Sequence, residues 1–243
     1  MTNEVATLDT RKFVPAMPED ANMNIQELLE DNLEGESLSP FDLERIVLPA
    51  GGGTTWTIPT IEGEKEVKDL QAVIIMPQSS RSFWKEEMTG EGTPPDCVSE
   101  DMIQGQGEPG GLCSACQYNQ FGSGKQGSGK ACKETKNLFI LLEGSMLPYV
   151  LQVPPTSLKN YKKYMGQLTG TGKSVNGVVT SFTIEKIKSG SGFTHGRIIF
   201  RPAGELSAEQ VTAVKQYRQM FKGFFAQNQS ANAPQGDAPR FEQ

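Results

Sequence analysis

Four cysteines form the clearest chemical pattern in this chain. They follow the spacing Cys97-x15-Cys113-x2-Cys116-x15-Cys132. A C-x2-C pair can place two thiolates on one metal ion, and one more cysteine on each side completes a tetrahedral four-thiolate site. The glycine-rich backbone around them lets amide groups approach the sulfur atoms. The sequence therefore predicts one structural Zn²⁺ per chain, bound by Cys97, Cys113, Cys116 and Cys132.

Other chemistries of these cysteines are less consistent with their context. Two disulfides would need an oxidising compartment, and no signal peptide precedes them. Thioredoxin-type redox chemistry needs the C-x2-C pair at the start of a helix that follows a strand, and no such pattern is present. A catalytic zinc needs an open coordination position, which four cysteine ligands leave no room for. Disulfides and redox chemistry remain the alternatives to structural zinc.

Two glycine-rich segments resemble phosphate-binding loops without completing the motif. In Gly124–Lys130, the next residue is Ala131 where the motif needs Ser or Thr; Gly170–Ser174 follows a predicted helix and lacks the first glycine. The chain has one histidine and no G-x-S-x-G motif. We therefore expect neither nucleotide binding nor enzymatic activity.

A nuclease that uses acidic residues near the cysteines is a further alternative, with Asp96, Glu100, Asp101 and Glu108 as metal ligands.

Charge is divided unevenly along the chain. Its 23 basic and 29 acidic residues give a net charge of −6. Residues 1–120 hold 22 acidic and 7 basic side chains, whereas residues 121–243 hold 7 acidic and 16 basic ones. This asymmetry indicates an acidic portion and a portion that binds polyanions. We expect the acidic N-terminal region to compete with nucleic acid for the basic surface, so that deleting residues 1–35 tightens binding unless this region covers apolar core.

Basic and aromatic side chains together suit a nucleic-acid strand, because cations neutralise phosphates and exposed rings stack on bases. The sharpest local pattern is Arg81-Ser82-Phe83-Trp84-Lys85, directly after a predicted strand. The predicted contacts are Arg81, Phe83, Trp84, Lys85, Phe121, Lys125, Lys130, Lys133, Lys159, Lys162, Lys163, Lys186 and Arg197.

Hydrophobic periodicity and turn residues predict the elements that position these groups. We expect a disordered acidic arm over residues 1–23 and two short helices over 24–50, the second over 39–46. The predicted strands cover 54–58, 70–76, 137–143, 147–153, 175–188 and 193–200, with a charged turn over 61–69. Helices are predicted over 157–168 and over about 204–225, and a disordered tail over 226–243.

The order from residue 70 onward is β-β-β-α-β-β, which is the order of an OB-fold barrel. The predicted class is mainly β with flanking helices (α+β): an OB-fold-like five-stranded barrel within residues 51–203. A long zinc-stapled insertion, residues 87–136, follows the first strand of the barrel. No run of 18 apolar residues occurs, so no membrane span is expected, and the predicted location is the cytoplasm.

Several strings resemble uncharacterised proteins from phages and mobile elements: Pro94–Cys97, Cys113–Cys116, Gly129–Lys133 and Pro154–Lys159. In architecture, a β-barrel with a zinc loop is similar to the zinc-containing single-stranded-DNA-binding proteins of tailed phages. This chain differs by having four cysteines where those proteins mix Cys and His, and by a less acidic C-terminus.

The resemblance implies a protein of phage or mobile-element replication or recombination that binds single-stranded DNA without sequence preference in a bacterial host. It also implies replication or recombination partners, recruited through the acidic N-terminal region or the C-terminal tail. The alternative is a zinc-stabilised adaptor that recruits replication or nuclease partners and makes little contact with DNA.

Overall fold

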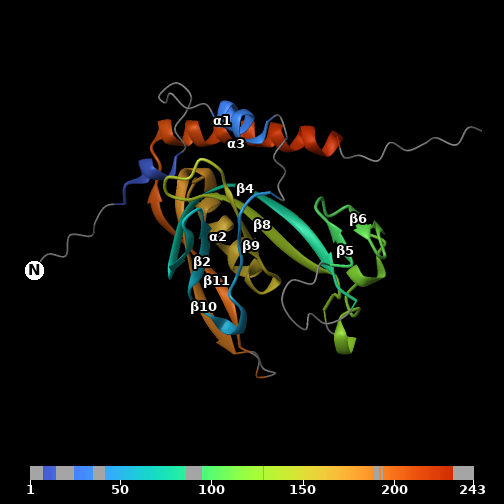
Figure 1. Cartoon of the computed structure of the whole chain (residues 1–243). Helices are drawn as coiled ribbons and strands as arrows, with labels where there is room; N and C mark the ends of the chain where they lie inside the picture. Colours follow the sequence, from blue (N-terminus) through green and yellow to red (C-terminus); the bar gives the residue numbers. More distant parts are fainter. Residues whose placement is uncertain are drawn as a thin grey trace, which may run out of the picture.

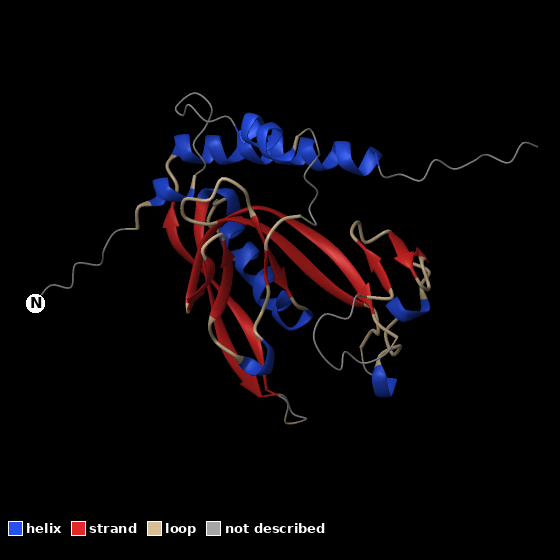
Figure 2. Cartoon of the chain, in the orientation of Figure 1, coloured by secondary structure: helices blue, strands red, loops and turns tan. Residues whose placement is uncertain are grey.

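The computed structural model describes residues 8–14, 25–34, 42–85, 95–127, 129–188, 192 and 194–231. Strands dominate this part of the chain, and helices flank them (Figures 1 and 2). Five strands form the central sheet in the antiparallel order β11-β10-β4-β8-β9. Their bounds are β4 (Asp69–Phe83), β8 (Lys133–Leu141), β9 (Tyr149–Val153), β10 (Val178–Lys188) and β11 (Thr194–Glu205). The mixed α+β class expected from the sequence is confirmed.

The central sheet does not close into a barrel within the described residues. No pairing joins β9 to β11; instead β9 pairs in parallel with the short β1 (Arg45–Ile46). The edge of β11 meets the helix α2 (Leu158–Gly170). There the Ile198 N–H donates to Ser157 Oγ, and Asn160 Nδ2 donates to the Ile198 carbonyl, both at 2.9 Å. Ser157, directly before α2, and Asn160 of α2 therefore satisfy polar groups that barrel closure would have paired.

Each face of the sheet carries its own hydrophobic core, because successive strand residues point to opposite sides. On one face, α2 buries Tyr161, Tyr164 and Leu168 against the strands. On the other face, α3 (Ala208–Ala231) buries Val214 and Tyr217, together with other residues of its apolar stripe. Figure 1 shows α3 along the top of the sheet with α1 (Ile25–Leu33) beside it. The predicted helices over 157–168 and about 204–225 are thus confirmed, as is the first of the two helices predicted within residues 24–50, although α3 begins at Ala208 and continues to Ala231.

A second, two-stranded sheet packs on the core under α2. It is a hairpin of β2 (Trp56–Thr60) and β3 (Gly63–Val67). Trp56 is fully buried, and its Nε1 donates to the Phe182 carbonyl at 2.8 Å. The sequence predicts β2 but assigns residues 61–69 to a turn, and that assignment is wrong for β3. Because β3 lies almost entirely in solvent, no apolar alternation marks it as a strand.

The helix expected over residues 39–46 is not formed in its described part. Residues 35–41 lie outside the described chain, and Arg45–Ile46 form β1. Leu43 belongs to the core under α3 and Ile46 to the core under α2. Residues three apart lie on the same face of a helix but on opposite faces of an extended chain. Burial on both sides of the sheet therefore requires the extended form.

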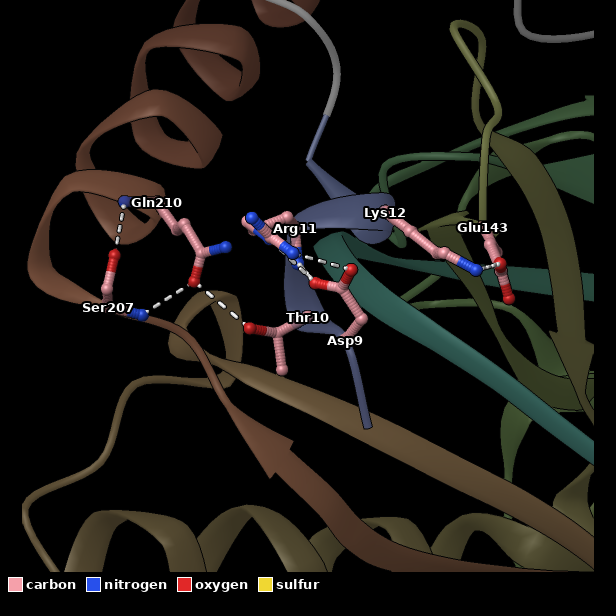
Figure 3. A network of polar contacts seen from close by, with 7 residues as sticks. All are labelled: Asp9, Thr10, Arg11, Lys12, Glu143, Ser207 and Gln210. Atoms are coloured by element: carbon pink, nitrogen blue, oxygen red, sulfur yellow. Dashed lines mark hydrogen bonds and ion pairs between the residues drawn. The ribbon is translucent and has the colours of Figure 1, made fainter. Parts of the chain in front are cut away.

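The N-terminal segment Leu8–Val14 is ordered and docked, which corrects the expected disordered arm for these residues. It contains the 3-10 turn η1 (Thr10–Phe13), and Phe13 is buried in the core under α3. Figure 3 shows how this turn is tied down: Thr10 Oγ1 donates to Gln210 Oε1 at 3.2 Å, and Lys12 pairs with Glu143 at 2.8 Å. Residues 1–7 and 15–24 lie outside the described chain.

None of the helices in the described chain has the length and apolar character needed to cross a membrane.

Candidate metal centre and nucleic-acid interface

A small lobe is built on the far ends of β4 and β8. We call residues 95–127 and 129–132 the Cys lobe. Its strands are β5 (Cys97–Ser99), which pairs with the end of β4, then β6 (Gln104–Gly107) and β7 (Gly111–Leu112). Figure 1 shows the lobe in green at the far end of β4 and β8. The long insertion expected from the sequence is therefore largely folded, and hydrogen-bonded strands attach it to the central sheet.

All four cysteines line one small cavity in the Cys lobe, of about 10 Å³. Each is a free thiol, so neither disulfide of the alternative hypothesis is present. Cys113 and Cys132 are buried, while Cys97 and Cys116 are partly exposed. Backbone hydrogen bonds fix two of these positions: Cys113 N–H donates to the Ile103 carbonyl and Cys132 N–H to the Tyr118 carbonyl, both at 2.8 Å. The predicted metal ligands thus converge on one point.

The residues around this cavity fit a small divalent ion. A Cβ placed on Gly105 would lie 2.9 Å from Cys97 Sγ, so a side chain there would push against a thiol. The lining contains four thiols and no carboxylate or histidine. Four thiolates leave no position for a reactive water, which suits a structural ion. Among the described residues, no group of three or more Cys, His, Asp or Glu side chains is arranged to hold a metal ion as it stands.

The pKa of the Cys132 thiol reflects its surroundings. Burial raises this pKa, the nearby Arg81 lowers it, and the other three cysteines raise it again. The last contribution has a simple cause, since negative charges on neighbouring thiolates repel one another. A bound cation would remove that repulsion, because its positive charge stabilises the deprotonated thiols.

Three of the predicted nucleic-acid contacts, Arg81, Phe83 and Lys130, contact side chains of the Cys lobe. Arg81 and Phe83 belong to the end of β4 rather than to a loop after it. Arg81 Nη1 donates to Asn119 Oδ1 at 2.6 Å, and Lys130 Nζ reaches the same oxygen at 3.1 Å. Phe83 is 5% exposed and stacks on Tyr118, with 4.0 Å between the ring centroids. In this structure Phe83 therefore offers no open ring face to a base.

The remaining predicted residues of this region point more openly to solvent. Phe121 is 85% exposed, and Lys125 and Lys133 are exposed. Trp84 is half-buried. Lys85 is exposed and forms an ion pair with Glu108 at 2.5 Å. The hydrogen bond to Glu108 is the main cause of the raised pKa of Lys85.

The three predicted lysines of α2 share its outward surface. Lys159, Lys162 and Lys163 are all exposed, whereas Tyr161 and Tyr164 on the inward surface are buried. The helix contains no acidic residue, and none of these lysines forms an ion pair with any described residue. The surface is therefore cationic without internal neutralisation. Sequence reasoning placed these lysines correctly because they interleave with the apolar residues of a regular helix.

The last two predicted contacts lie on a different element from either group. Lys186 and Arg197 lie on the β10–β11 hairpin. Arg197 is opposite Glu185 in the strand register and pairs with it at 2.9 Å. Because Arg197 adjoins the buried Ile198 in an extended strand, it points to the other side of the sheet from α2. An ion-paired arginine on that side is a poor candidate for the same binding surface.

Sequence reasoning missed Asn119 near the site, and Lys136 is not among the predicted contacts. Asn119 accepts hydrogen bonds from Arg81 and Lys130, and its Nδ2 donates to the Cys113 carbonyl at 2.7 Å. Lys136 donates to Ser79 Oγ at 2.5 Å and lies over the Tyr161 ring, 5.5 Å from its centroid. No motif marks Asn119, because its role depends on contacts between segments that are distant in the sequence.

A wider hollow than the cysteine cavity lies elsewhere. It has a volume of about 900 Å³ and runs between the β2–β3 hairpin and the β8–β9 turn. Its lining mixes apolar side chains with Lys65, Asp69 and Glu143, and it shares no residue with the cysteine cavity.

Comparison with protein-family models, curated protein sequences and solved structures finds no match for this chain. The functional interpretation depends on the geometry described above.

Proposed function

We propose that this protein binds single-stranded DNA without sequence preference, and that a Zn²⁺ ion held by the four cysteines stabilises its Cys lobe. The observation that carries the DNA-binding proposal is the outward surface of α2. Its lysines at positions 159, 162 and 163 have no acidic partner among the described residues. Such a surface attracts a phosphate backbone and releases the counterions condensed on it.

The strand order supports an OB-like interpretation. The order β11-β10-β4-β8-β9 matches that of an OB barrel left open between β9 and β11. As in an OB fold, the helix α2 lies in the chain between the third and fourth of these five strands, which here are β9 and β10. OB folds bind oligonucleotides on their second and third strands and on the loops beside them. Here the corresponding strands are β8 and β9, and the Cys lobe occupies the first of those loops.

The path of the DNA strand is limited by α3. Phe139 of β8 and Val150 of β9 are buried in the core under this helix. The other face of these strands is also closed, because Leu138 and Leu151 are buried in the core under α2. The proposed path of the DNA therefore follows the outward surface of α2 and the Cys lobe rather than the strands themselves. We propose that the α2 lysines neutralise phosphates and that Phe121 stacks on a base. Such stacking contributes about 1–3 kcal/mol per base.

The test compares two triple variants with equal changes in charge. K159Q/K162Q/K163Q removes the α2 surface, and the control K65Q/K68Q/K215Q removes three exposed lysines from the hairpin region and α3. Fluorescence anisotropy with a labelled oligo-dT measures their affinities. The α2 variant should bind about 10- to 100-fold more weakly in 0.1 M salt, and the control should bind like the wild type. Equal losses would contradict the proposed surface. Absence of binding by the wild type would favour the adaptor hypothesis.

A further inference from the structure

Arg81 is placed unusually for a residue that binds DNA. It lines the cysteine cavity, and its Nη1 hydrogen-bonds to Asn119. Its Nε is buried and has no hydrogen-bond partner among the described residues. Glu134 faces it across β4 and β8, but the two form no ion pair. A buried N–H without an acceptor costs about 1–3 kcal/mol, so a group that accepts from this nitrogen would stabilise the lobe.

A second cation lies beside it. Lys130 Nζ reaches the same amide oxygen of Asn119, at 3.1 Å. Two positive charges thus meet on one neutral oxygen, and the cavity lining contains no carboxylate to balance them. Like charges at this spacing repel, and partial burial weakens the screening by water. Neither cation forms an ion pair with an acidic side chain among the described residues.

A metal centre in the cavity would supply a balancing negative charge. A divalent ion bound by four cysteines displaces four thiol protons, so the centre carries a net charge of −2. We propose that Arg81 and Lys130 are the counter-cations of a metal–tetrathiolate centre, held beside it by Asn119, with Arg81 Nε–H donating to a cysteine sulfur. This inference rests on the proposed metal centre, and it removes both residues from the DNA-binding surface.

Asn119 is the positioning residue in this proposal. Its Oδ1 holds the two cations, its Nδ2 donates to the Cys113 carbonyl at 2.7 Å, and its backbone N–H donates to the Cys116 carbonyl at 3.1 Å. Asn119 thereby connects both cations to the C-x2-C pair through its side chain and its backbone. Partners of this kind around a metal site typically change metal affinity 10- to 100-fold when they are mutated.

The experiment uses the full chain and Co²⁺, whose visible absorption reports four-thiolate coordination. Affinities for Co²⁺ and Zn²⁺ are measured by competition with a chelator for wild type, R81M, K130M and the control K133M. Lys133 is an exposed lysine of the same region that does not contact Asn119. R81M and K130M should each bind metal about 10- to 100-fold more weakly, with K133M close to wild type. R81K, which retains the charge, should recover part of the loss.

Stability without metal separates this role from simple packing. In the metal-free chain the two cations repel each other, so R81M should be as stable as wild type or more stable. In the metal-loaded chain R81M should melt at a lower temperature than wild type. A lower melting temperature in both states would overturn the proposal and assign Arg81 a packing role.

The remaining outcomes separate this inference from the functions proposed above. If wild type gives no four-thiolate Co²⁺ spectrum, the metal centre fails and the counter-cations with it. If wild type binds Co²⁺ but R81M and K130M bind it as tightly as K133M, only the counter-cation role fails. Metal-loaded R81M should retain wild-type affinity for oligo-dT, and loss of that affinity would return Arg81 to the DNA contacts.

Discussion

Ser157 and Ile198 join the start of α2 to the open edge of the central sheet. The Ile198 N–H donates to Ser157 Oγ at 2.9 Å, and both residues are fully buried. In a closed barrel, polar groups along this edge would pair with another strand. The helix takes over that role at Ile198, which explains how the sheet stays open without leaving this amide unpaired.

Removing this hydroxyl should therefore destabilise the fold. S157A leaves the buried Ile198 N–H without its acceptor, and we expect the free energy of unfolding to fall by about 1–3 kcal/mol. Urea unfolding followed by circular dichroism measures the change. T169A is the control, since Thr169 is exposed on the same helix and bonds only within it. Equal midpoints for S157A and wild type would show that the bond contributes nothing.

The N-terminal segment should act as part of the core. F13A removes a ring that is 2% exposed, and large-to-small changes of this kind cost about 3 kcal/mol. R11A changes an exposed residue of the same turn and should have little effect. Thermal unfolding compares the two variants. Equal melting temperatures would mean that Phe13 is not part of a stable core.

Deletion of residues 1–35 should also destabilise the protein, because it removes Phe13. Sequence reasoning favours autoinhibition by the acidic region, so that its deletion would tighten DNA binding. Phe13 and Leu29 instead pack on the core under α3. We therefore expect the deletion to lower the melting temperature. A deletion variant with unchanged stability and tighter DNA binding would restore the autoinhibition hypothesis.

Glu100 should make stability depend on pH. Burial raises the pKa of this carboxyl, Arg45 lowers it and Asp101 raises it, with a net upward shift. A carboxyl whose pKa is higher in the folded state favours folding when protonated, and this contribution is lost as pH rises through the folded pKa. E100Q should thus raise the melting temperature at pH 7, and the gain should disappear below about pH 4. The exposed E64Q should show no such gain, and an equal response of both variants would argue against burial as the cause.

Zinc content and lobe stability should change together. We expect one Zn²⁺ per chain after purification without chelator. C113S should lose the ion and become sensitive to proteolysis in the Cys lobe, while β4 and β8 stay protected, because metal-binding energy here is local folding energy. Mass spectrometry of the native protein and of the proteolytic fragments measures both effects. Protein without metal, or cleavage that spreads into the central sheet, would contradict the expectation.

Regular periodicity accounts for what the sequence predicted well. Val214 and Tyr217 recur at helical spacing, and β8 and β9 are short apolar runs separated by a turn, so α3 and this hairpin are correctly placed. The pattern fails where both sides of an element face solvent, or where the apolar residues of one segment are buried in two different cores. β3 has no apolar face, and Leu43 and Ile46 enter different cores, so both segments were misassigned.

The convergence of the four cysteines was predictable from the sequence, but the surroundings of their cavity were not. Cysteine spacing is a local property, and the four thiols do meet at one cavity. The partners of Arg81 depend on a lobe that folds back onto the end of β4, so a basic-aromatic string looked like a DNA contact although Phe83 is covered by Tyr118. The pairing of Arg197 with Glu185 likewise follows from the register of a hairpin, which charge counts along a sequence do not contain.

The central claim is tested most directly by titrating the zinc-loaded wild-type chain with labelled single-stranded and double-stranded oligonucleotides over a range of salt concentrations. If the three α2 lysines and the exposed Lys125 and Lys133 contact phosphates, the logarithm of the single-strand affinity should fall against the logarithm of salt concentration with a slope of about −3.5. Affinity for the duplex should be lower. A response to salt that is flat, or equal affinity for both forms, would contradict the account.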